Sequence, residues 1–511
     1  MTSRYRFALA SFLSALCLAA LSDPSEAASA TRLVPVVVDV VGVGGARFTT
    51  ELVVSNAGTS DATVSLDYTA SPYFGGVGSG STSVTIAAGT QAWTPDAMSF
   101  LRSRIPSIPA GPGQGGSLRV TFDGLSSATA GSVVARTTTP SGPGRAGLAY
   151  SGIDPALHTA SLTAVVGLLE NDADRSNLAL VNAGTAGPVT LHVTLFSGDG
   201  AYYQDLSPDV VLQPGEWTQI NRVLASPGAG FSDGWALVER VAGTDAFLAY
   251  GVVNDNVTND GSFVPGIPED LADSDLIVPV LVETPTFQSE LTLTNPHGFP
   301  VYAYIQYVES LAAAGTPTGV FYQLLGPYEQ AVTPDVLNEL RSAGATIGPV
   351  GGSYAGALAV TFTDGTFRVA GLATARTTSP APSGGVYGLA YPGATYGEAA
   401  TEAYVFGLFE SDQVRSNLAI VNAALYNGTI RVQIEVFDGD TGAKTSEESV
   451  VLTPGQWVQK NAVLGALRNG YVHLTVVEGN DLFLAYGVVN DGATDTTGTN
   501  DGSFVSMAKV K

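Results

Sequence analysis

Residues 167–184 read GLLENDADRSNLALVNAG, and residues 407–424 read GLFESDQVRSNLAIVNAA, a return after 240 residues. A second stretch, ARTTTPSGPGRAGLAY at 135–150, comes back as ARTTSPAPSGGVYGLAY at 375–391. Self-similarity at a fixed spacing is the signature of repeated structural units. The repeats therefore predict that the chain is a duplication of one long unit.

Each copy of the unit is itself double. ELVVSNAGTSDATVSLDY at 51–68 matches NLALVNAGTAGPVTLHVTLF at 177–196, so that Asn56 falls on Asn182. Stretches such as PGIPEDLADSDL, rich in turn-forming residues, separate the copies and are typical of short linkers. Four modules are predicted, at 33–152, 160–266, 276–393 and 402–507.

The modules have the sequence pattern of β-structure. Positions 189, 191, 193 and 195 are Val or Leu, whereas 190, 192 and 194 are Thr, His and Thr. Such a period of two marks a half-buried strand. Short strands joined by Asn-Ala-Gly, Pro-Gly and Asp-Gly turns favour a two-sheet sandwich. The predicted fold class is all-β, with tandem immunoglobulin-like antiparallel β-sandwiches.

One short helix is predicted in each odd module. TPDAMSFLRSR (94–104) and TPDVLNELRS (333–342) share a start signal. Thr94 is the predicted cap of the first amides, Pro95 suits the first helical position and Asp96 complements the helix dipole. In the even modules QINRVL and QKNAVL stand at this place and predict a single turn.

Four motifs recur along nearly the whole chain after the N-terminal segment: L-x-[LV]-x-N at strand ends, RSNLA, LxPGxW and VVND…NDGSFV. In these motifs the chain resembles uncharacterised exported bacterial proteins built of tandem immunoglobulin-like β-sandwich modules. The resemblance implies the fold and supplies no catalytic residues. Trp217 and Trp457 of LxPGxW are expected to cover the core beside the short turn.

The N-terminus has the pattern of a secretory signal peptide. Arg4 and Arg6 precede the apolar run 7–21, and small residues offer cleavage after Ala27 or Ala30. Such a segment is removed on export, so residues 1–30 are predicted to be a signal peptide. The predicted location is extracellular or at the cell surface, with the periplasm as an alternative. No second long apolar run follows, so no transmembrane segment is expected after cleavage.

The net charge limits which classes of partner the protein can bind, and the cysteine content limits its chemistry. The formal net charge is −24, which repels phosphate backbones and anionic lipids, so no nucleic-acid binding is expected. Cations and neutral sugars suit such a surface better. The single cysteine lies in the signal segment, so the mature chain has neither disulfides nor thiolate chemistry.

Catalytic patterns are missing from the sequence. None of the four histidines forms an HxxxH or HxH pair, the spacing usual for zinc ligands. No G-x-S-x-G elbow between a strand and a helix and no GK[ST] phosphate loop occurs. The sequence therefore predicts a protein that is not an enzyme and has no resident cofactor. Calcium is the one ion that its residues could bind.

The calcium hypothesis rests on AYGVVNDNVTNDGSFVP (249–265) and its copy at 485–505. Calcium favours hard oxygen ligands of Asp and Asn. The alternative is that Asn, Asp and Gly here simply form tight turns, and it is the favoured one. The candidate metal ligands are Asn254, Asp255, Asp260, Asn490, Asp491 and Asp501.

Two other groups of residues could act as binding sites. Tyr302 and Tyr304 share a strand face and could stack on a flat ligand such as a sugar; Tyr202 and Tyr203 form a second pair. Arginines recur in ARTT and RSNLA and are expected to pair with carboxylates or strand-end carbonyls. They are Arg136, Arg376, Arg175 and Arg415.

These observations lead to a functional hypothesis and an alternative. The hypothesis is an exported, non-enzymatic structural, adhesive or surface-interaction protein whose modules form a rod or two paired lobes. The alternative is a set of ligand-binding modules for carbohydrate or calcium, accessory to a secreted enzyme system. Extracellular protein or glycan would be the partner, and exposed edge strands would allow self-association.

Overall fold

A computed structural model describes residues 28–42, 45–313, 315–424, 428–494 and 496–511. The predicted signal peptide lies outside the described residues except for 28–30. Those three residues open the first strand, where Ala28 pairs with Leu125. In the described part of the chain, no helix combines the length and the apolar character needed to cross a membrane.

The first module is a sandwich in which one long strand joins the two sheets. The strand order is β4-β3-β6-β1-β2-β7-β8, with β5 paired to β2. β1 runs beside β6 from Ala28 to Asp39 and then pairs with β2, with a register shift between Val34 and Val37. The core lies between the two halves. The strands are β1 (Ala28–Val41), β2 (Arg47–Asn56), β3 (Ala62–Ala70), β4 (Gly80–Ile86), β5 (Thr90–Thr94), β6 (Gln114–Leu125), β7 (Gly131–Ser141) and β8 (Gly144–Ser151).

The third module repeats this arrangement. Its order is β22-β21-β25-β19-β20-β26-β27, with β23 beside β21, β24 beside β20 and β28 beside β19. The strands are β19 (Asp275–Glu283), β20 (Gln288–Thr294), β21 (Val301–Glu309), β22 (Thr316–Pro317), β23 (Phe321–Leu325), β24 (Gln330–Thr333), β25 (Tyr354–Thr363), β26 (Leu372–Pro380), β27 (Val386–Pro392) and β28 (Ala394–Thr395).

The second module separates into two sheets. One has the order β14-β10-β16-β17, and the other β12-β11-β15-β9-β18 with β13 beside β11. The strands are β9 (Leu162–Leu169), β10 (Asp174–Asn182), β11 (Val189–Ser197), β12 (Tyr203–Asp205), β13 (Val210–Leu212), β14 (Trp217–Ile220), β15 (Asp233–Ala242), β16 (Phe247–Asp255), β17 (Gly261–Pro265) and β18 (Ile267–Pro268).

The fourth module follows the second, with sheets β33-β30-β35-β36 and β32-β31-β34-β29-β37. Every sheet draws its strands from one module, so the chain is an all-β series of sandwiches, as predicted. The strands are β29 (Glu402–Phe409), β30 (Val414–Asn422), β31 (Ile430–Asp438), β32 (Lys444–Leu452), β33 (Trp457–Lys460), β34 (Asn469–Glu478), β35 (Phe483–Asp491), β36 (Gly502–Ser506) and β37 (Ala508–Lys509).

Both predicted helices form, but the predicted cap is wrong. In α1 (Ala97–Arg104) the Asp96 carboxylate accepts from Ser99 N at 2.8 Å. In α2 (Val336–Ser342) Asp335 takes the same place. Thr94 instead ends strand β5, because the chain is still extended there. The second module has the predicted single turn, a 3₁₀ turn at Val223–Ala225.

The asparagine that ends the L-x-[LV]-x-N motif closes the strand-end loop of every module. Asn182 has no exposed surface; its amide donates to the carbonyls of Gly187 (2.9 Å) and Leu212 (3.1 Å) and its oxygen accepts from Gly184 N (3.0 Å). A buried backbone group needs such a partner. The equivalent residues Asn56, Asn295 and Asn422 make the same kinds of bonds.

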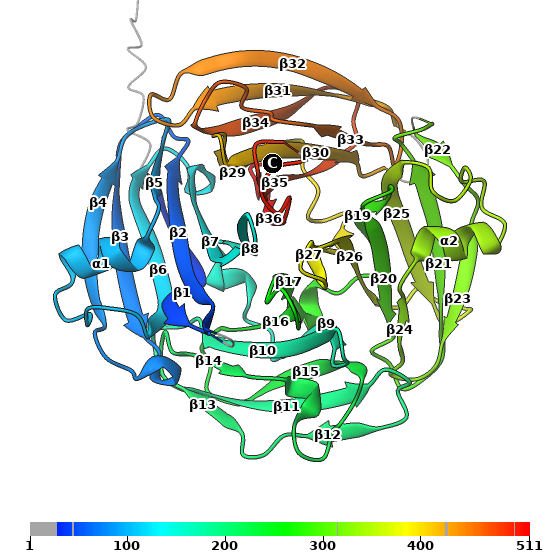
Figure 1. Cartoon of the computed structure of the whole chain (residues 1–511), viewed down its shortest axis with the longest axis horizontal. Coiled ribbons are helices and arrows are strands. Elements are labelled where there is room, and N and C mark those ends of the chain that lie inside the picture. Colours follow the sequence, from blue (N-terminus) through cyan, green and yellow to red (C-terminus); the bar gives the residue numbers. More distant parts are fainter. Residues whose placement is uncertain (1–27, 43–44, 314, 425–427, 495) are drawn as a thin grey trace, which may run out of the picture.

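The four modules form a closed ring, so the expected rod or pair of lobes does not occur (Figure 1). The last two long strands of each module make a hairpin that points to the centre. β17 contacts β8 and β27, and β36 contacts the same two strands. We call these four hairpins the hub: β7–β8, β16–β17, β26–β27 and β35–β36.

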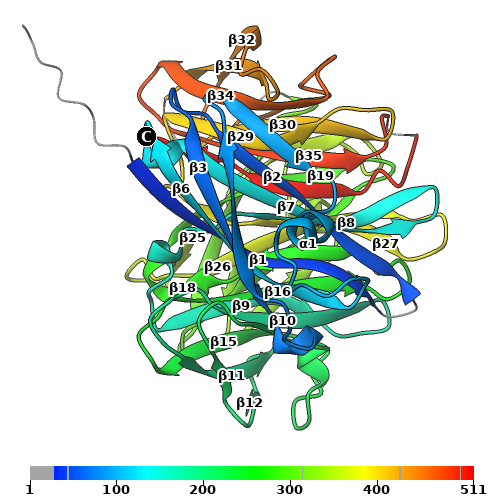
Figure 2. The same cartoon turned by 90° about the vertical axis from the view of Figure 1, so that its left-hand side faces the viewer.

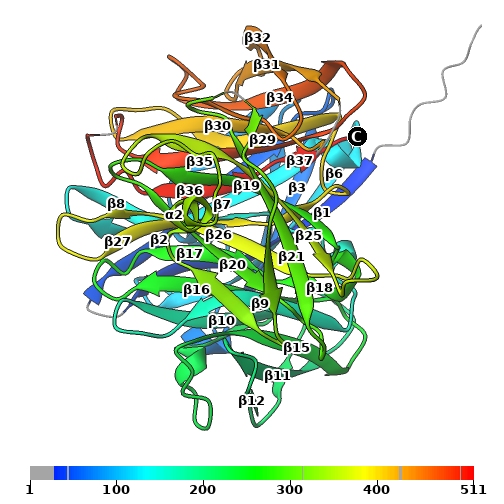
Figure 3. The ribbon, with the colours of Figure 1, turned by 90° about the vertical axis from the view of Figure 1, so that its right-hand side faces the viewer.

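The hub projects from one face of the ring. Seen from the side, the tips of β7–β8 and β26–β27 extend beyond the modules (Figure 2). The start of β1 and the C-terminus lie at the opposite face, as the other side view also shows (Figure 3).

A tryptophan lies at each of the four seams between neighbouring modules. Trp217 stacks on Phe74 of the first module (5.3 Å between ring centroids), and Trp93 contacts Phe409 of the fourth (5.3 Å). The other two are Trp235, whose Nε1 donates to Tyr328 O across the second and third modules (2.9 Å), and Trp457, which shares an apolar cluster with Ile277 and Val280 of the third.

The expected role of Trp217 and Trp457 is thereby corrected. Trp217 belongs to a cluster with Leu33 and Tyr150 of the first module. Its indole also donates to Tyr250 Oη at 2.8 Å, as Trp457 does to Tyr486 Oη at 3.0 Å. Both tryptophans join two modules instead of covering the core of one.

Candidate functional site

The Asn/Asp-rich stretches are the loops of the two even hairpins in the hub. One lies between β16 and β17, and the other between β35 and β36. Asn259 and Asn500 both have φ 58°, a left-handed conformation that asparagine tolerates better than most residues. The turn interpretation therefore explains part of the recurring composition.

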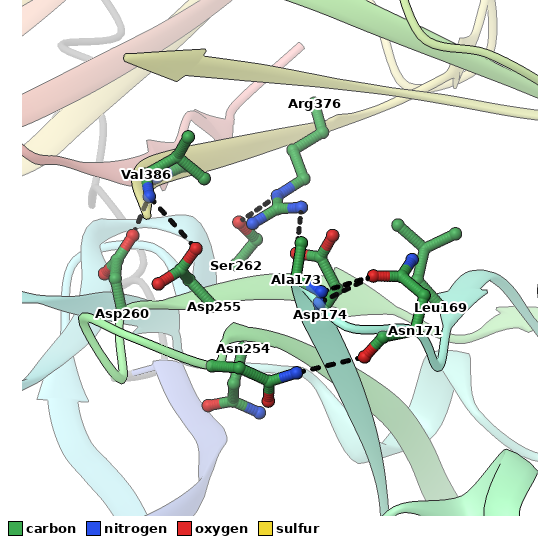
Figure 4. Close-up of polar contacts among 12 residues, drawn as sticks. Leu169, Asn171, Ala173, Asp174, Asn254, Asp255, Asp260, Ser262, Arg376 and Val386 are labelled. Carbon is green, nitrogen blue, oxygen red and sulfur yellow. Dashed lines mark hydrogen bonds and ion pairs between the residues drawn. The ribbon is translucent and has the colours of Figure 1, made fainter. Parts of the chain in front are cut away.

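Asp255 and Asp491 accept hydrogen bonds from amides of their own loops, and Asp255 also contacts a neighbouring module. Asp255 Oδ1 accepts from the amides of Val257 (2.9 Å) and Thr258 (2.7 Å), and Oδ2 accepts from Val386 N of the third module at 3.0 Å (Figure 4). Asp491 Oδ2 accepts from Thr499 N at 2.7 Å. Each carboxylate is almost fully buried.

Asp260 and Asp501 attach the even loops to the odd hairpins. Asp260 Oδ2 accepts from Gly388 N at 2.7 Å, and Asp501 Oδ2 accepts from Gly147 N at 2.8 Å. The two acceptors thus satisfy equivalent backbone amides in β27 and β8. Sequence reasoning placed these residues in one motif but could not show that their partners belong to other modules.

The calcium hypothesis gains no support from this geometry. The side-chain amides of Asn254 and Asn490 donate back to Val252 O (3.0 Å) and Val488 O (3.2 Å). Across the described ranges no group of three or more His, Cys, Asp or Glu side chains is placed to hold a metal ion. Calcium binding stays an untested alternative, and the observed bonds are those of structural loops.

The recurring arginines also hold the hub. Arg175 donates to Asp255 O (3.1 Å), Asn256 Oδ1 (3.0 Å) and Asn259 Oδ1 (2.9 Å). In the fourth module Arg415 bonds Gly492 O at 2.9 Å and the side chain of Asn500. The RSNLA motif therefore serves to fix the loop of its own hairpin.

The ARTT arginines act between modules. Arg376 lies between Ser262 and Asp174 of the second module, with Nε 3.1 Å from Ser262 Oγ and Nη1 2.8 Å from the Asp174 carboxylate (Figure 4). Arg136 Nε likewise donates to Ser503 Oγ of the fourth module at 3.1 Å. The predicted pairing with a carboxylate holds for Arg376.

A different kind of site lies on the outside of the third module. Tyr302 and Tyr304 of β21 share a face with Tyr322 of β23, which pairs with Tyr304. Tyr322 lies 6.0 Å from each of the other two rings, measured between centroids. Tyr304 is 41 % exposed and Tyr322 66 %. We call these three residues the outer tyrosine face.

The first module lacks this face. Its strands β3 and β4 pair in the same register, and Ser65 lies opposite Ser83 where the third module has Tyr304 opposite Tyr322. The sequence analysis found Tyr302 and Tyr304 but missed Tyr322. The alternation in FYQLL (321–325) signals an outward Tyr322, but only the register places it beside Tyr304. Tyr202 and Tyr203 are exposed in the second module and do not belong to the face.

Two small pockets lie between modules, and neither is large enough for an organic substrate. Each has a volume of about 10 Å³, and each lies at a seam. One is lined by Glu51 and Arg136 together with Phe409, and the other by Gln306 and Asn422. Such a volume holds about one water molecule.

Comparison with known proteins identifies no family. No family model matches the chain, and no curated protein does. Among solved structures, a Bacteroides uniformis β-glucuronidase aligns at 12 % identity and a TM-score of 0.11, over 45 % of this chain and 25 % of that one. β-Glucuronidase 2 of the same organism, bound to cyclophellitol-6-carboxylate aziridine, aligns at 10 % identity and a TM-score of 0.10, over 44 % and 25 %. This chain thus spans a quarter of each, and neither likeness carries an argument.

Proposed function

We propose that this protein is an exported, non-enzymatic surface-interaction protein that binds neutral carbohydrate through the outer tyrosine face of its third module. The observation that carries the proposal is the grouping of Tyr302, Tyr304 and Tyr322 on one exposed sheet surface. Export is supported by the N-terminal sequence pattern.

Aromatic rings are suited to sugars because their faces are apolar while the tyrosine hydroxyl is polar. A sugar ring likewise presents C–H groups on its faces and hydroxyls at its rim. Within the described parts of the chain the hydroxyls of the three tyrosines have no hydrogen-bond partner, so all three are free for a ligand. A flat ligand could therefore contact the rings and at the same time form hydrogen bonds with the hydroxyls.

The position of the face favours a preformed site. β21 lies between β25 and β23; it pairs with β25 from Tyr302 to Glu309 and with β23 from Val301 to Ile305. Sites on paired strands are held more rigidly than sites on loops, which reduces the ordering entropy lost on binding. The net charge of −24 disfavours anionic polysaccharides and leaves neutral glycans as the ligand class.

The test restores the residues that the first module has at these positions. Tyr304→Ser combined with Tyr322→Ser should leave the fold intact, because both side chains are exposed. A glycan array probed with the wild-type mature chain should give neutral glycans as hits, and calorimetry on a hit should show at least a tenfold weaker affinity for the double variant. The bound glycan should be recovered uncleaved.

The matched control changes two exposed tyrosines outside the face. Tyr202→Ser combined with Tyr203→Ser should leave glycan affinity unchanged. The proposal fails if the wild type binds no glycan, or if the control variant loses as much affinity as the Tyr304/Tyr322 variant. If sedimentation shows that the wild type is a dimer and that the Tyr304/Tyr322 variant is a monomer, the face serves self-association instead.

A further inference from the structure

Two aspartates from equivalent places in the duplicated unit meet in the hub. Asp260 belongs to the loop of the second module and Asp501 to that of the fourth. Their carboxyl groups are close enough to interact directly with one another. Their exposed fractions are 1 % and 2 %, so bulk water does not solvate either group.

Each carboxyl group has one oxygen with a partner and one without. The Oδ2 atoms accept the backbone amides of Gly388 and Gly147. The Oδ1 atoms of Asp260 and Asp501 find no donor in the part of the chain that the structure describes. Two ionised carboxylates can only accept hydrogen bonds, so a contact between them needs a proton. Like charges this close in a buried site cannot both be maintained.

We propose that Asp260 and Asp501 share one proton in the folded ring, and that this proton is a pH-sensitive lock joining the second and fourth modules across the hub. The carboxylic O–H of one residue donates to the carboxylate of the other. Because each aspartate also holds an odd hairpin through Oδ2, the shared proton connects all four modules at one point.

The nearby arginines do not replace this proton. Arg136 and Arg376 direct their Nε atoms to Ser503 and Ser262. The buried Nη2 atom of each arginine has no hydrogen-bond partner among the described residues, so it does not donate to the aspartate pair. Their charges still favour ionisation of one carboxyl group and disfavour a metal cation at the same place. Tyr387 on β27 also interacts with both aspartates. The other charged groups of the hub nearby are Asp255 and Asp491 on the even hairpins and Asp174 on β10.

The pKa directions agree with a shared proton. Burial is the largest cause for both groups; it raises the pKa of Asp260 to about 6 and the pKa of Asp501 well above its usual value. The charge of Asp260 raises the pKa of Asp501 further, whereas Arg376 and Arg136 oppose the shift.

The sign of the pH dependence follows from proton linkage. An unfolded aspartate has a pKa of about 3.9, so above that pH the folded ring binds a proton that the unfolded chain does not. The contribution of the pair to stability is therefore largest in acid. It falls as the pH rises through about 6, the pKa of Asp260, and is lost once Asp501, whose pKa is also raised, is ionised as well.

The experiment compares urea unfolding of the wild-type mature chain with Asp260→Asn and Asp501→Asn between pH 4.5 and 8.5. An asparagine amide donates to the remaining carboxylate at every pH, so it acts as a permanent substitute for the proton. The equilibrium constant for unfolding of the wild type, relative to either variant, should rise with pH by up to tenfold per unit. At pH 8 each variant should be more stable than the wild type.

Asp255→Asn is the matched control, because Asp255 lies in the same loop and is equally buried. It should lower stability at all pH values and keep the pH dependence of the wild type. Carboxyl-detected NMR of the wild type at pH 5.5 should show a protonated aspartate that is missing in Asp260→Asn. The proposal is overturned if every wild-type aspartate titrates below pH 4.5, or if the two Asn variants retain the wild-type slope. The NMR titration decides the matter if a variant does not fold.

Discussion

Replacing Gln91 by alanine should open the seam between the first and fourth modules. Gln91 is 2 % exposed and its side chain makes four hydrogen bonds. Its Oε1 accepts from Gly407 N at 2.9 Å and Ser55 Oγ at 3.1 Å, and its Nε2 donates to Asn469 Oδ1 at 2.7 Å and Gly470 O at 3.1 Å. At about 1 kcal/mol net for each bond, the loss is about 4 kcal/mol, and more if the buried partners stay unsatisfied.

Gln330 is the matched control, since it occupies the equivalent place at the seam between the second and third modules. Its Oε1 accepts from Gly167 N at 2.7 Å and more distantly from Thr294 Oγ1 at 3.5 Å. Its Nε2 has no partner among the described residues. Gln330→Ala should therefore lose only about 1–2 kcal/mol, although both substitutions remove the same volume.

The assay is equilibrium urea unfolding of both variants, followed by far-ultraviolet circular dichroism and tryptophan fluorescence. Trp93 contacts Phe409 at the seam that Gln91 joins, so fluorescence should report its opening. Equal losses for the two variants, or a larger loss for Gln330→Ala, would refute the assignment of the seam energy to hydrogen bonds.

Three further predictions follow from the same geometry. Asn182→Ala leaves one buried and two partly buried backbone groups without partners. It should lower the free energy of unfolding by about 3 kcal/mol in urea unfolding, and a loss below about 1 kcal/mol would contradict the loop-closing role. Asp96→Ala removes the observed helix cap and should lower the free energy of unfolding by about 1 kcal/mol. Thr94→Ala should lower it by less, which thermal melts can check. Calcium should give no heat in calorimetry and no thermal shift, and Asp255→Ala should be destabilised equally with calcium or with a chelator.

The repeated glycine at the start of GLLENDAD and GLFESDQV shows why some motifs could not be interpreted from the sequence. Gly167 and Gly407 both have φ 72°, in the left-handed region that favours glycine. They lie in a bulge of the first strand of their modules. Each turns its N–H toward a glutamine of another module. Nothing near these glycines in the chain indicates that distant partner.

The repeated Asn/Asp stretch was correctly predicted to form a turn, but the prediction did not include its bonds to other modules. Asn, Asp and Gly identify a tight loop wherever they cluster between strands. The same residues also satisfy amides of the odd hairpins, as Asp260 does for Gly388. The odd hairpins carry Ser, Gly and Pro at their tips, and the backbone amides of Gly388 and Gly147 in their strands find carboxylate acceptors in the even modules.

The sequence by itself determined the internal duplication, the all-β fold class, the two helices and the buried face of strands such as the one at 189–195. These follow from local periodicity and self-similarity. The inner strands β16 and β35 are instead buried at every residue, because neighbouring modules cover their second face. Only the tertiary structure decided that the modules close into a ring, that each tryptophan lies at a seam and that Asp260 meets Asp501. These contacts depend on which faces of separately folded sandwiches come together, and residues 241 positions apart carry no local signal of their meeting.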